Sequence, residues 1–148
     1  MEAQPDFKEM FELLNRHKAQ FIIAGAYALA FHGVPRNTGD IDVYINPTRA
    51  NARKILAALN DFGFGSLKLT EADFTILGNV IQLGAPPVRI DFLNELSGVS
   101  WNEADKGKIA GNYGGVQVHY LGRAQLVANK WATGRKKDLA DLEAMGEE

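Results

Sequence analysis

The sequence contains no cysteine among its 148 residues. This absence excludes disulfide scaffolds, iron–sulfur clusters, thiolate zinc sites and cysteine nucleophiles, and it is compatible with a reducing compartment. The chain also lacks an apolar run of membrane-spanning length, and its acidic N-terminal segment lacks the basic-then-apolar order of a signal peptide. We therefore expect a cytoplasmic protein with no membrane contact.

A strong charge imbalance is absent as well. The 16 Lys and Arg residues nearly balance the 18 Asp and Glu residues, which leaves a formal net charge of −2. This balance argues against a histone-like protein that binds polyanions regardless of their sequence. The chain has the composition of a globular protein and is long enough to bury one core. No repeat or linker divides it, so the sequence predicts a single domain over residues 1–148.

Apolar periodicity predicts alternating helices and strands in the first half of the chain. An expected N-terminal cap pair, Asp6 and Glu9, precedes an amphipathic helix whose apolar face comprises Phe7, Met10, Phe11 and Leu14. A wholly apolar strand over 21–24 ends at Gly25, before a helical stretch over 27–31 and a loop over 33–39. Asn46 and Pro47 are expected to begin a further helix, which ends at Gly63 and buries Ala52, Ile55, Leu56 and Leu59.

The second half predicts a hairpin, a last strand and a helical tail. The runs 80–83 and 88–93 are joined by Gly84-Ala85-Pro86-Pro87, which indicates an antiparallel pair. Residues 116–120 read as a strand, and residues 124–133 and 137–145 as two helices separated near Gly134, in a tail that begins at about residue 122. The predicted fold class is α/β (α+β) with a mixed sheet.

Carboxylates gather on one face of the predicted sheet. Residues 40–45 alternate with period two, which sends Asp40 and Asp42 to the face that Tyr44 shares, opposite Ile41, Val43 and Ile45. Two carboxylates this close repel each other unless a hard cation lies between them. Mg²⁺ commonly binds one or two carboxylates together with substrate phosphates. Asp91 adds a third carboxylate that is able to bridge metals or to take a proton from an attacking hydroxyl.

Phosphate-binding features lie next to these carboxylates. A strand that ends at Gly25 and enters a helix presents free backbone N–H groups, and Arg36 adds a fork of donors. Each feature has a simpler interpretation: solvated aspartates at a strand start, a turn at Gly25, a surface Arg36, or an Asp91 that pairs with Arg89. Their convergence on one strand–Gly–helix–loop–strand unit favours a nucleoside triphosphate site.

This unit resembles the signature of the nucleotidyltransferase fold of the DNA polymerase β superfamily, with Gly25-Ala26 as the small-residue pair and Asp40-Ile41-Asp42 as the metal-binding pair. Within that superfamily, residues 24–33 together with Arg36, Thr38 and the aspartate pair are most similar to small bacterial nucleotidyltransferase-like proteins related to abortive-infection (AbiEii-type) toxins. Residues 126–130 and 135–142 are also similar. The resemblance spans residues 21–142 and implies a mixed, mostly antiparallel sheet flanked by helices.

The resemblance also implies an activity and a set of site residues. Asp40, Asp42 and Asp91 would be the catalytic residues and would ligate Mg²⁺ or Mn²⁺. The nucleotide would be bound by Gly25, Ala26, Arg36, Thr38 and Lys130. The implied reaction moves a nucleoside monophosphate from a nucleoside triphosphate to a hydroxyl or phosphate of an RNA, protein or small-molecule acceptor, with release of pyrophosphate.

Two alternatives share this scaffold. One is a nucleotidyltransferase-like binding protein with weak or no catalysis, such as a component of a toxin–antitoxin or phage-defence pair, which would act through a partner protein. Ala26 favours it, because many active relatives have Ser or a second Gly at this place and a hydroxyl contact to phosphate is therefore lost. The other alternative is an antibiotic-modifying adenylyltransferase.

Overall fold

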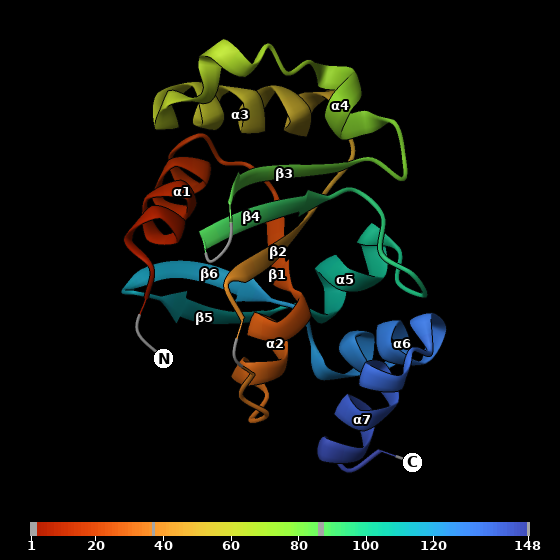
Figure 1. Cartoon of the computed structure of the whole chain (residues 1–148). Coiled ribbons are helices and arrows are strands. Elements are labelled where there is room, and N and C mark those ends of the chain that lie inside the picture. The colour runs from red at the N-terminus through yellow and green to blue at the C-terminus, as the bar shows by residue number, and fades with distance from the viewer. Residues whose placement is uncertain (1–2, 37, 86–87, 148) are drawn as a thin grey trace.

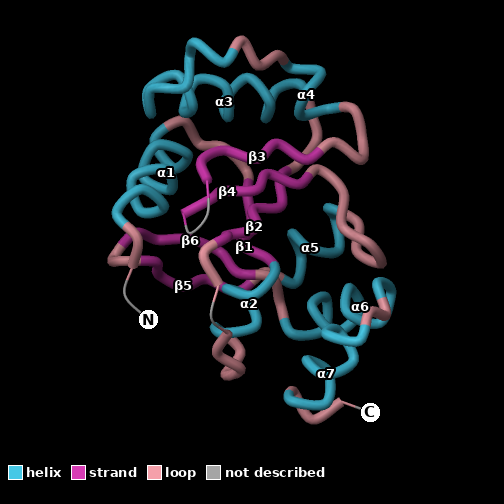
Figure 2. Tube along the Cα trace, viewed as in Figure 1, coloured by secondary structure: helices cyan, strands magenta, loops and turns pink. Residues whose placement is uncertain are grey.

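A computed structural model describes residues 3–36, 38–85 and 88–147 of the chain. Figures 1 and 2 show a twisted central sheet with helices on both of its faces. The sheet has six strands in the order β3-β4-β2-β1-β6-β5. Two neighbouring pairs, β1–β6 and β2–β4, are parallel, whereas the other three pairs are antiparallel. The predicted mixed, mostly antiparallel sheet flanked by helices is therefore confirmed.

The bounds of the elements are as follows. The strands are β1 (Phe21–Ala24), β2 (Asp40–Ile45), β3 (Val80–Ala85), β4 (Val88–Leu93), β5 (Ile109–Tyr113) and β6 (Val116–Tyr120). The α-helices are α1 (Pro5–Arg16), α2 (Gly25–Phe31), α3 (Arg49–Leu59), α4 (Glu71–Thr75), α5 (Trp101–Gly107), α6 (Arg123–Thr133) and α7 (Lys136–Ala144). No helix in the described residues combines the length and the apolar character that crossing a membrane requires.

The larger core lies between α1, α3, α4 and one face of the sheet. The apolar face predicted for the first helix is buried there, and β2 contributes Ile41, Val43 and Ile45. Phe11 stacks on Phe21 of β1 with 5.6 Å between ring centroids. Each fully buried side chain of this size stabilises the fold by about 1.5–3 kcal/mol relative to an exposed one. This packing anchors β2 and β1, which lie at the centre of the sheet.

The opposite face of the sheet is covered by α2, α5 and α6. Their smaller core includes Ile22, Leu29, Leu121 and Leu126, together with Tyr44, whose hydroxyl donates to the Val99 carbonyl at 3.1 Å. Since Tyr44 shares its face of β2 with Asp40 and Asp42, the predicted alternation is confirmed. The acidic face is therefore the one that these helices partly cover.

Two predicted helix starts are wrong. The first helix begins at Pro5 with Gln4 as its N-cap, so Asp6 and Glu9 do not form the cap pair. A proline suits this position because it lacks an N–H that the helix would leave unpaired. The N-cap of α3 is Thr48, whose hydroxyl accepts the N–H of Asn51, so the helix starts after Asn46 and Pro47 rather than at them.

Other segments agree more closely with the prediction, and three further elements were not predicted. The β3–β4 pair is antiparallel as predicted, while Pro86 and Pro87 of its expected connection lie outside the described residues. The helix α3 ends at Leu59, and Gly63 lies with φ +109° in the short π-helical turn that follows. The two C-terminal helices are confirmed within one residue, and Gly134 separates them in a left-handed conformation. The elements α4, α5 and β5 had no counterpart in the prediction.

Candidate functional site

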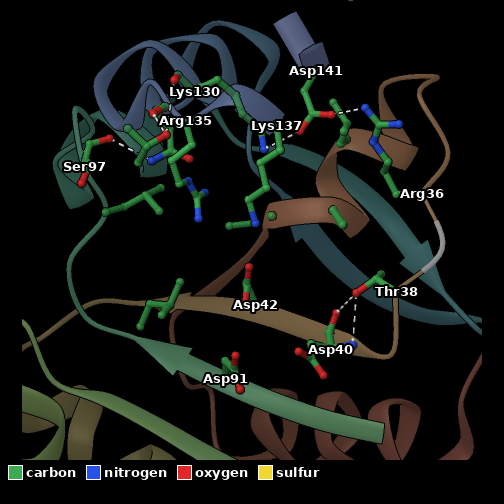
Figure 3. Close-up of a pocket in the computed structure, with 18 of the residues that line it drawn as sticks. Arg36, Thr38, Asp40, Asp42, Asp91, Ser97, Lys130, Arg135, Lys137 and Asp141 are labelled. Carbon is green, nitrogen blue, oxygen red and sulfur yellow. Dashed lines mark hydrogen bonds and ion pairs between the residues drawn. The ribbon is translucent and has the colours of Figure 1, made fainter. Parts of the chain in front are cut away.

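The register of two parallel strands brings the three predicted carboxylates together. On β2 and β4, Asp40 lies beside Arg89 and Asp42 lies beside Asp91. Alternate residues of a strand share a face, so all four side chains project from the same side of the sheet. Figure 3 shows the three labelled carboxylates on these adjacent strands at the floor of a cavity. The structure thus places Asp40, Asp42 and Asp91 at one site.

Arg89 links two of these carboxylates. Its Nε lies 2.8 Å from Oδ1 of Asp91, and its Nη2 lies 3.0 Å from Oδ2 of the same residue. The same Nη2 lies 2.9 Å from Oδ2 of Asp40. The hydrogen bonds to Asp91 raise the pKa of Arg89 further, so the guanidinium stays charged. The sequence suggested Arg89 only as a possible ion-pair partner of Asp91, and it did not predict the contact of Arg89 with Asp40.

Asp42 differs from its neighbours because no described residue forms an ion pair or a side-chain hydrogen bond with it. Burial, followed by repulsion from Asp91 and Asp40, raises the pKa of Asp42, while Lys137 and Arg89 oppose this shift. The carboxylate lies against Gly25, which has φ +61°; a Cβ there would lie 3.0 Å from Cγ of Asp42 and closer still to its Oδ2. Glycine at position 25 therefore leaves the space that the Asp42 carboxylate occupies.

A cavity of about 870 Å³ opens above the carboxylates. This volume is in the range of pockets that hold a small-molecule ligand. Gly25 and Ala26 line it at the start of α2, and the opposite wall is formed by α6, α7 and the segment before α7. Basic residues on this wall are Lys130, Arg135 and Lys137, joined by Arg36 from the loop after α2. Figure 3 shows Lys137 pointing from α7 toward Asp42.

The predicted nucleotide contacts line this cavity, but three of them have partners within the protein. Arg36 forms an ion pair with Asp141 of α7. Lys130 is only 7% exposed, and its Nζ lies 3.0 Å from Asp141 and 3.4 Å from Asp138. The hydroxyl of Thr38 accepts the backbone N–H of Asp40 at 3.2 Å, which fixes the start of β2. Their roles as nucleotide contacts remain predictions.

Two of the acids of α7, Asp138 and Asp141, are held in a network of paired charges. Burial alone would raise the pKa of Asp138, but hydrogen bonds from Arg135 and Thr133 lower it well below the usual range. Burial also opposes ionisation of Asp141, whose pKa is nevertheless lowered by Arg36 and Lys130. Lys137, by contrast, is exposed and has no ion-pair partner among the described residues. From the sequence, Lys130 and not Lys137 was predicted as a nucleotide contact.

The carboxylates suit a divalent cation in chemistry, although not in their present arrangement. Carboxylate oxygens are the ligands that Mg²⁺ and Mn²⁺ prefer, and Asp42 offers one with no partner among the described residues. However, no three acidic or histidine side chains in the described parts of the chain converge closely enough to hold a metal ion. The chemistry of the donor set fits the ion, while Asp40 and Asp91 are paired with the guanidinium of Arg89.

Comparison with known proteins identifies the fold. No protein-family model matches the sequence, and no protein of curated function matches it either. The chain is similar in structure to the crystal structure of a Thermotoga maritima protein (TM1012) described as a “putative nucleotidyltransferase”, with a TM-score of 0.62 and 13% sequence identity. The match covers 93% of this chain and 88% of that chain. The chain therefore has a nucleotidyltransferase fold, as the sequence resemblance implied.

Proposed function

We propose that the protein is a metal-dependent nucleotidyltransferase, which transfers a nucleoside monophosphate from a nucleoside triphosphate to a hydroxyl or phosphate acceptor. One observation carries this proposal: Asp40, Asp42 and Asp91 face a basic wall across a cavity large enough for a nucleotide. A triphosphate that brings a divalent cation would complement both sides, because the cation meets the acids and the phosphates meet the bases. The nucleotidyltransferase fold supports the same reaction class.

The three carboxylates would hold the cation, Mg²⁺ or Mn²⁺. When bound, it would neutralise charge on the triphosphate and lower the pKa of the attacking hydroxyl. The acceptor oxygen forms a bond to the α-phosphorus, and the bond from that phosphorus to the oxygen bridging to the β-phosphate breaks. Pyrophosphate leaves with the electron pair of that bond. We assign the proton of the acceptor to a carboxylate oxygen of Asp91, the third acid of the site.

The basic wall would orient the triphosphate. Lys137 is the strongest candidate for a direct phosphate contact, because it points into the cavity and is exposed. Arg36 could turn from Asp141 to a phosphate, since its own side chain is 41% exposed. Lys130 would contribute mainly by holding α7 in place, because Asp138 and Asp141 of α7 already bind its ammonium group. Gly25 and Ala26 carry no side chain that would keep a phosphate away from their backbone.

Calorimetric titration tests the proposal directly. Each of the four ribonucleoside triphosphates is titrated with Mg²⁺ into the wild type, the Asp40→Ala/Asp42→Ala variant and a control, Asp105→Ala, which lies outside the cavity and pairs with Lys108. We expect metal-dependent binding of one preferred nucleotide to the wild type and to the control, and its loss in the double variant. Absence of binding at millimolar nucleotide would contradict the proposal.

A second candidate is a nucleotide-binding protein that does not transfer. The ion pairs of Arg89 with Asp40 and Asp91 favour it, because a permanent arginine there would replace the cation. This candidate predicts nucleotide affinity that is the same with Mg²⁺ and with a chelator. It corresponds to the toxin–antitoxin or phage-defence role considered from the sequence, in which a partner protein receives the signal.

The narrower resemblance to abortive-infection relatives favours a role in defence. Overproduction of the protein in a bacterial host separates this role from drug modification. Growth arrest that disappears in Asp42→Asn would support a toxin. Antibiotic resistance without growth arrest would instead support the antibiotic-modifying alternative.

A further inference from the structure

Arg89 occupies the position between two of the three carboxylates that the proposed function assigns to the metal. Its guanidinium binds both oxygens of Asp91 and one oxygen of Asp40, at 2.8–3.0 Å. We propose that Arg89 is a displaceable counter-ion that keeps the metal site closed until the triphosphate draws it away. This inference rests on the proposed function and adds to it an order of assembly.

The charges of the cluster make Arg89 a direct competitor of the cation. Three carboxylates on one sheet face repel one another, and the single charge of Arg89 offsets part of that repulsion. A forked pairing between arginine and a carboxylate is among the stronger charge-assisted interactions in proteins. A divalent ion that arrives alone must break this pairing before Asp40 and Asp91 can ligate it. The metal alone is therefore expected to bind weakly.

A triphosphate removes this obstacle because guanidinium binds phosphate as readily as carboxylate. Arg89 lines the same cavity as Gly25, Lys137 and the three acids, so its guanidinium is near a phosphate that is bound there. Transfer of the guanidinium to a phosphate would release Asp40 and Asp91 for the cation. Metal and nucleotide would then raise each other's affinity, since coupling between two binding equilibria is reciprocal.

The local structure lets the arginine move and holds its partners still. Its side chain is 25% exposed, and its cross-strand neighbour on β3 is Gly84, which places no side chain beside it. Asp40 is fixed by the bond from its backbone N–H to the Thr38 hydroxyl, and Asp91 is buried within the paired strands. The guanidinium, rather than either carboxylate, is therefore the group that gives way.

The test measures binding of Mn²⁺ alone, without nucleotide, by calorimetry on four folded proteins. These are the wild type, Arg89→Gln, Arg89→Lys and Lys137→Gln. The glutamine at 89 removes both charge and fork, whereas the lysine keeps the charge and loses the fork. The variant at 137 removes a charge that faces Asp42 but leaves the Arg89 pairing intact, so it controls for net charge. Circular dichroism and thermal melting confirm that each variant is folded.

We expect Arg89→Gln to bind Mn²⁺ about tenfold more tightly than the wild type, with Arg89→Lys between them and Lys137→Gln within about threefold of the wild type. Unchanged or weaker binding in Arg89→Gln would overturn the inference and leave the proposed function intact. An equal gain in Lys137→Gln would also overturn it, because net charge alone would then explain the effect. If neither the wild type nor Arg89→Gln binds Mn²⁺, the metal site of the proposed function fails together with the inference.

A second measurement uses the wild-type protein and so does not depend on a variant. The side-chain Nε–H resonance of Arg89 is followed by ¹⁵N NMR while Mg²⁺ and a non-hydrolysable triphosphate analogue are added together. We expect this resonance to move as the bond to Asp91 is exchanged for one to phosphate, and to stay in place with low-millimolar Mg²⁺ alone. A resonance that does not move when the nucleotide site is saturated would show that Arg89 is a permanent part of the site.

Discussion

Two groups of acidic residues differ in how their charges are compensated: Asp138 and Asp141 on α7, and Asp40, Asp42 and Asp91 on the floor of the cavity. On α7, Asp138 is fully buried, and Arg135, Thr133 and Lys130 donate to it. On β2, Asp42 is partly buried and receives no side-chain hydrogen bond from any described residue. Burial disfavours the charged form of both acids, yet the pKa of Asp138 is lowered and that of Asp42 is raised.

The difference separates a structural role from a binding role. Acids whose charge is compensated within the protein hold α6 and α7 together, and they stabilise the wall that presents Lys137. An acid kept without compensation is costly to the free protein and becomes useful only when a ligand supplies the missing charge. Asp40 and Asp91 lie between these cases, because Arg89 compensates them in part.

The largest effect is expected on catalysis in Asp42→Asn. The amide keeps the shape of the side chain but removes a carboxylate from the proposed cation site, so the rate should fall roughly 10³-fold or more. The rate is measured as pyrophosphate release from the triphosphate that calorimetry selects. Asp105→Asn serves as the matched control and should retain the wild-type rate. Turnover within tenfold of the wild type in Asp42→Asn would contradict the catalytic role proposed for Asp42.

The next largest effect is expected on stability in Asp138→Asn. Removing the charge leaves buried Lys130 with a weaker partner, so the free energy of unfolding should fall by about 3 kcal/mol in denaturant titrations at pH 7. Asp105→Asn, which breaks a partly exposed pair, should cost less than about 1 kcal/mol. A similar loss in both variants would mean that the α6–α7 network adds nothing beyond a surface ion pair.

The same network has a predictable pH dependence. Because the pKa of Asp138 is lower in the folded protein than in the unfolded chain, its stabilisation is fully present above the ordinary carboxyl range. It is lost as the pH falls through that range toward the lowered folded-state pKa. The difference in unfolding free energy between wild type and Asp138→Asn should therefore be constant near neutral pH and shrink below about pH 4. A difference that grows on acidification would contradict the assigned pairing.

The carboxylate cluster was predictable from the sequence because strand alternation is a local property. The period-two pattern of residues 40–45 determines which side chains share a face, and it placed Asp42 correctly. The same spacing puts Arg89 and Asp91 on one face of β4. What the sequence could not supply is the register between β2 and β4, which sets Arg89 beside Asp40. That register follows from packing of both strands in the sheet, between residues about fifty positions apart.

The basic wall was less predictable, because its residues differ only in their surroundings. Lys130 and Lys137 lie in one cluster of like charge, and a charge count cannot rank them. Their roles are decided by the turn at Gly134, which folds α7 back so that its acids meet Lys130. The start of α3 was misplaced for a related reason: two capping signals, Asn46 and Thr48, lie close together, and the observed hydrogen bond belongs to Thr48.

Two neighbouring lysines on α7 test whether contact with the cavity, rather than charge alone, determines nucleotide binding. Lys137 lines the cavity, whereas Lys136 is exposed and does not. We expect Lys137→Ala to weaken triphosphate binding about tenfold, the typical contribution of a charge-assisted contact, and Lys136→Ala to leave it unchanged. Calorimetry with the preferred nucleotide measures both. Equal effects in the two variants would indicate that the charge of the helix as a whole, rather than a contact from Lys137, attracts the nucleotide.

The smallest effect is expected on the stability of Asp42→Asn, and its sign is opposite to that of Asp138→Asn. A neutral amide removes repulsion from Asp91 and Asp40 and no longer places an uncompensated charge in a partly buried site. The free energy of unfolding without metal or nucleotide should therefore rise by about 1 kcal/mol, as is common when a functional site is neutralised.

Asp6→Asn on the exposed start of α1 is the control and should change stability by no more than a few tenths of a kcal/mol. Denaturant titration at pH 7 in the presence of a chelator measures all three proteins. A loss of stability in Asp42→Asn would mean that the folded protein already compensates this carboxylate, and the contrast between the two acidic groups would fail.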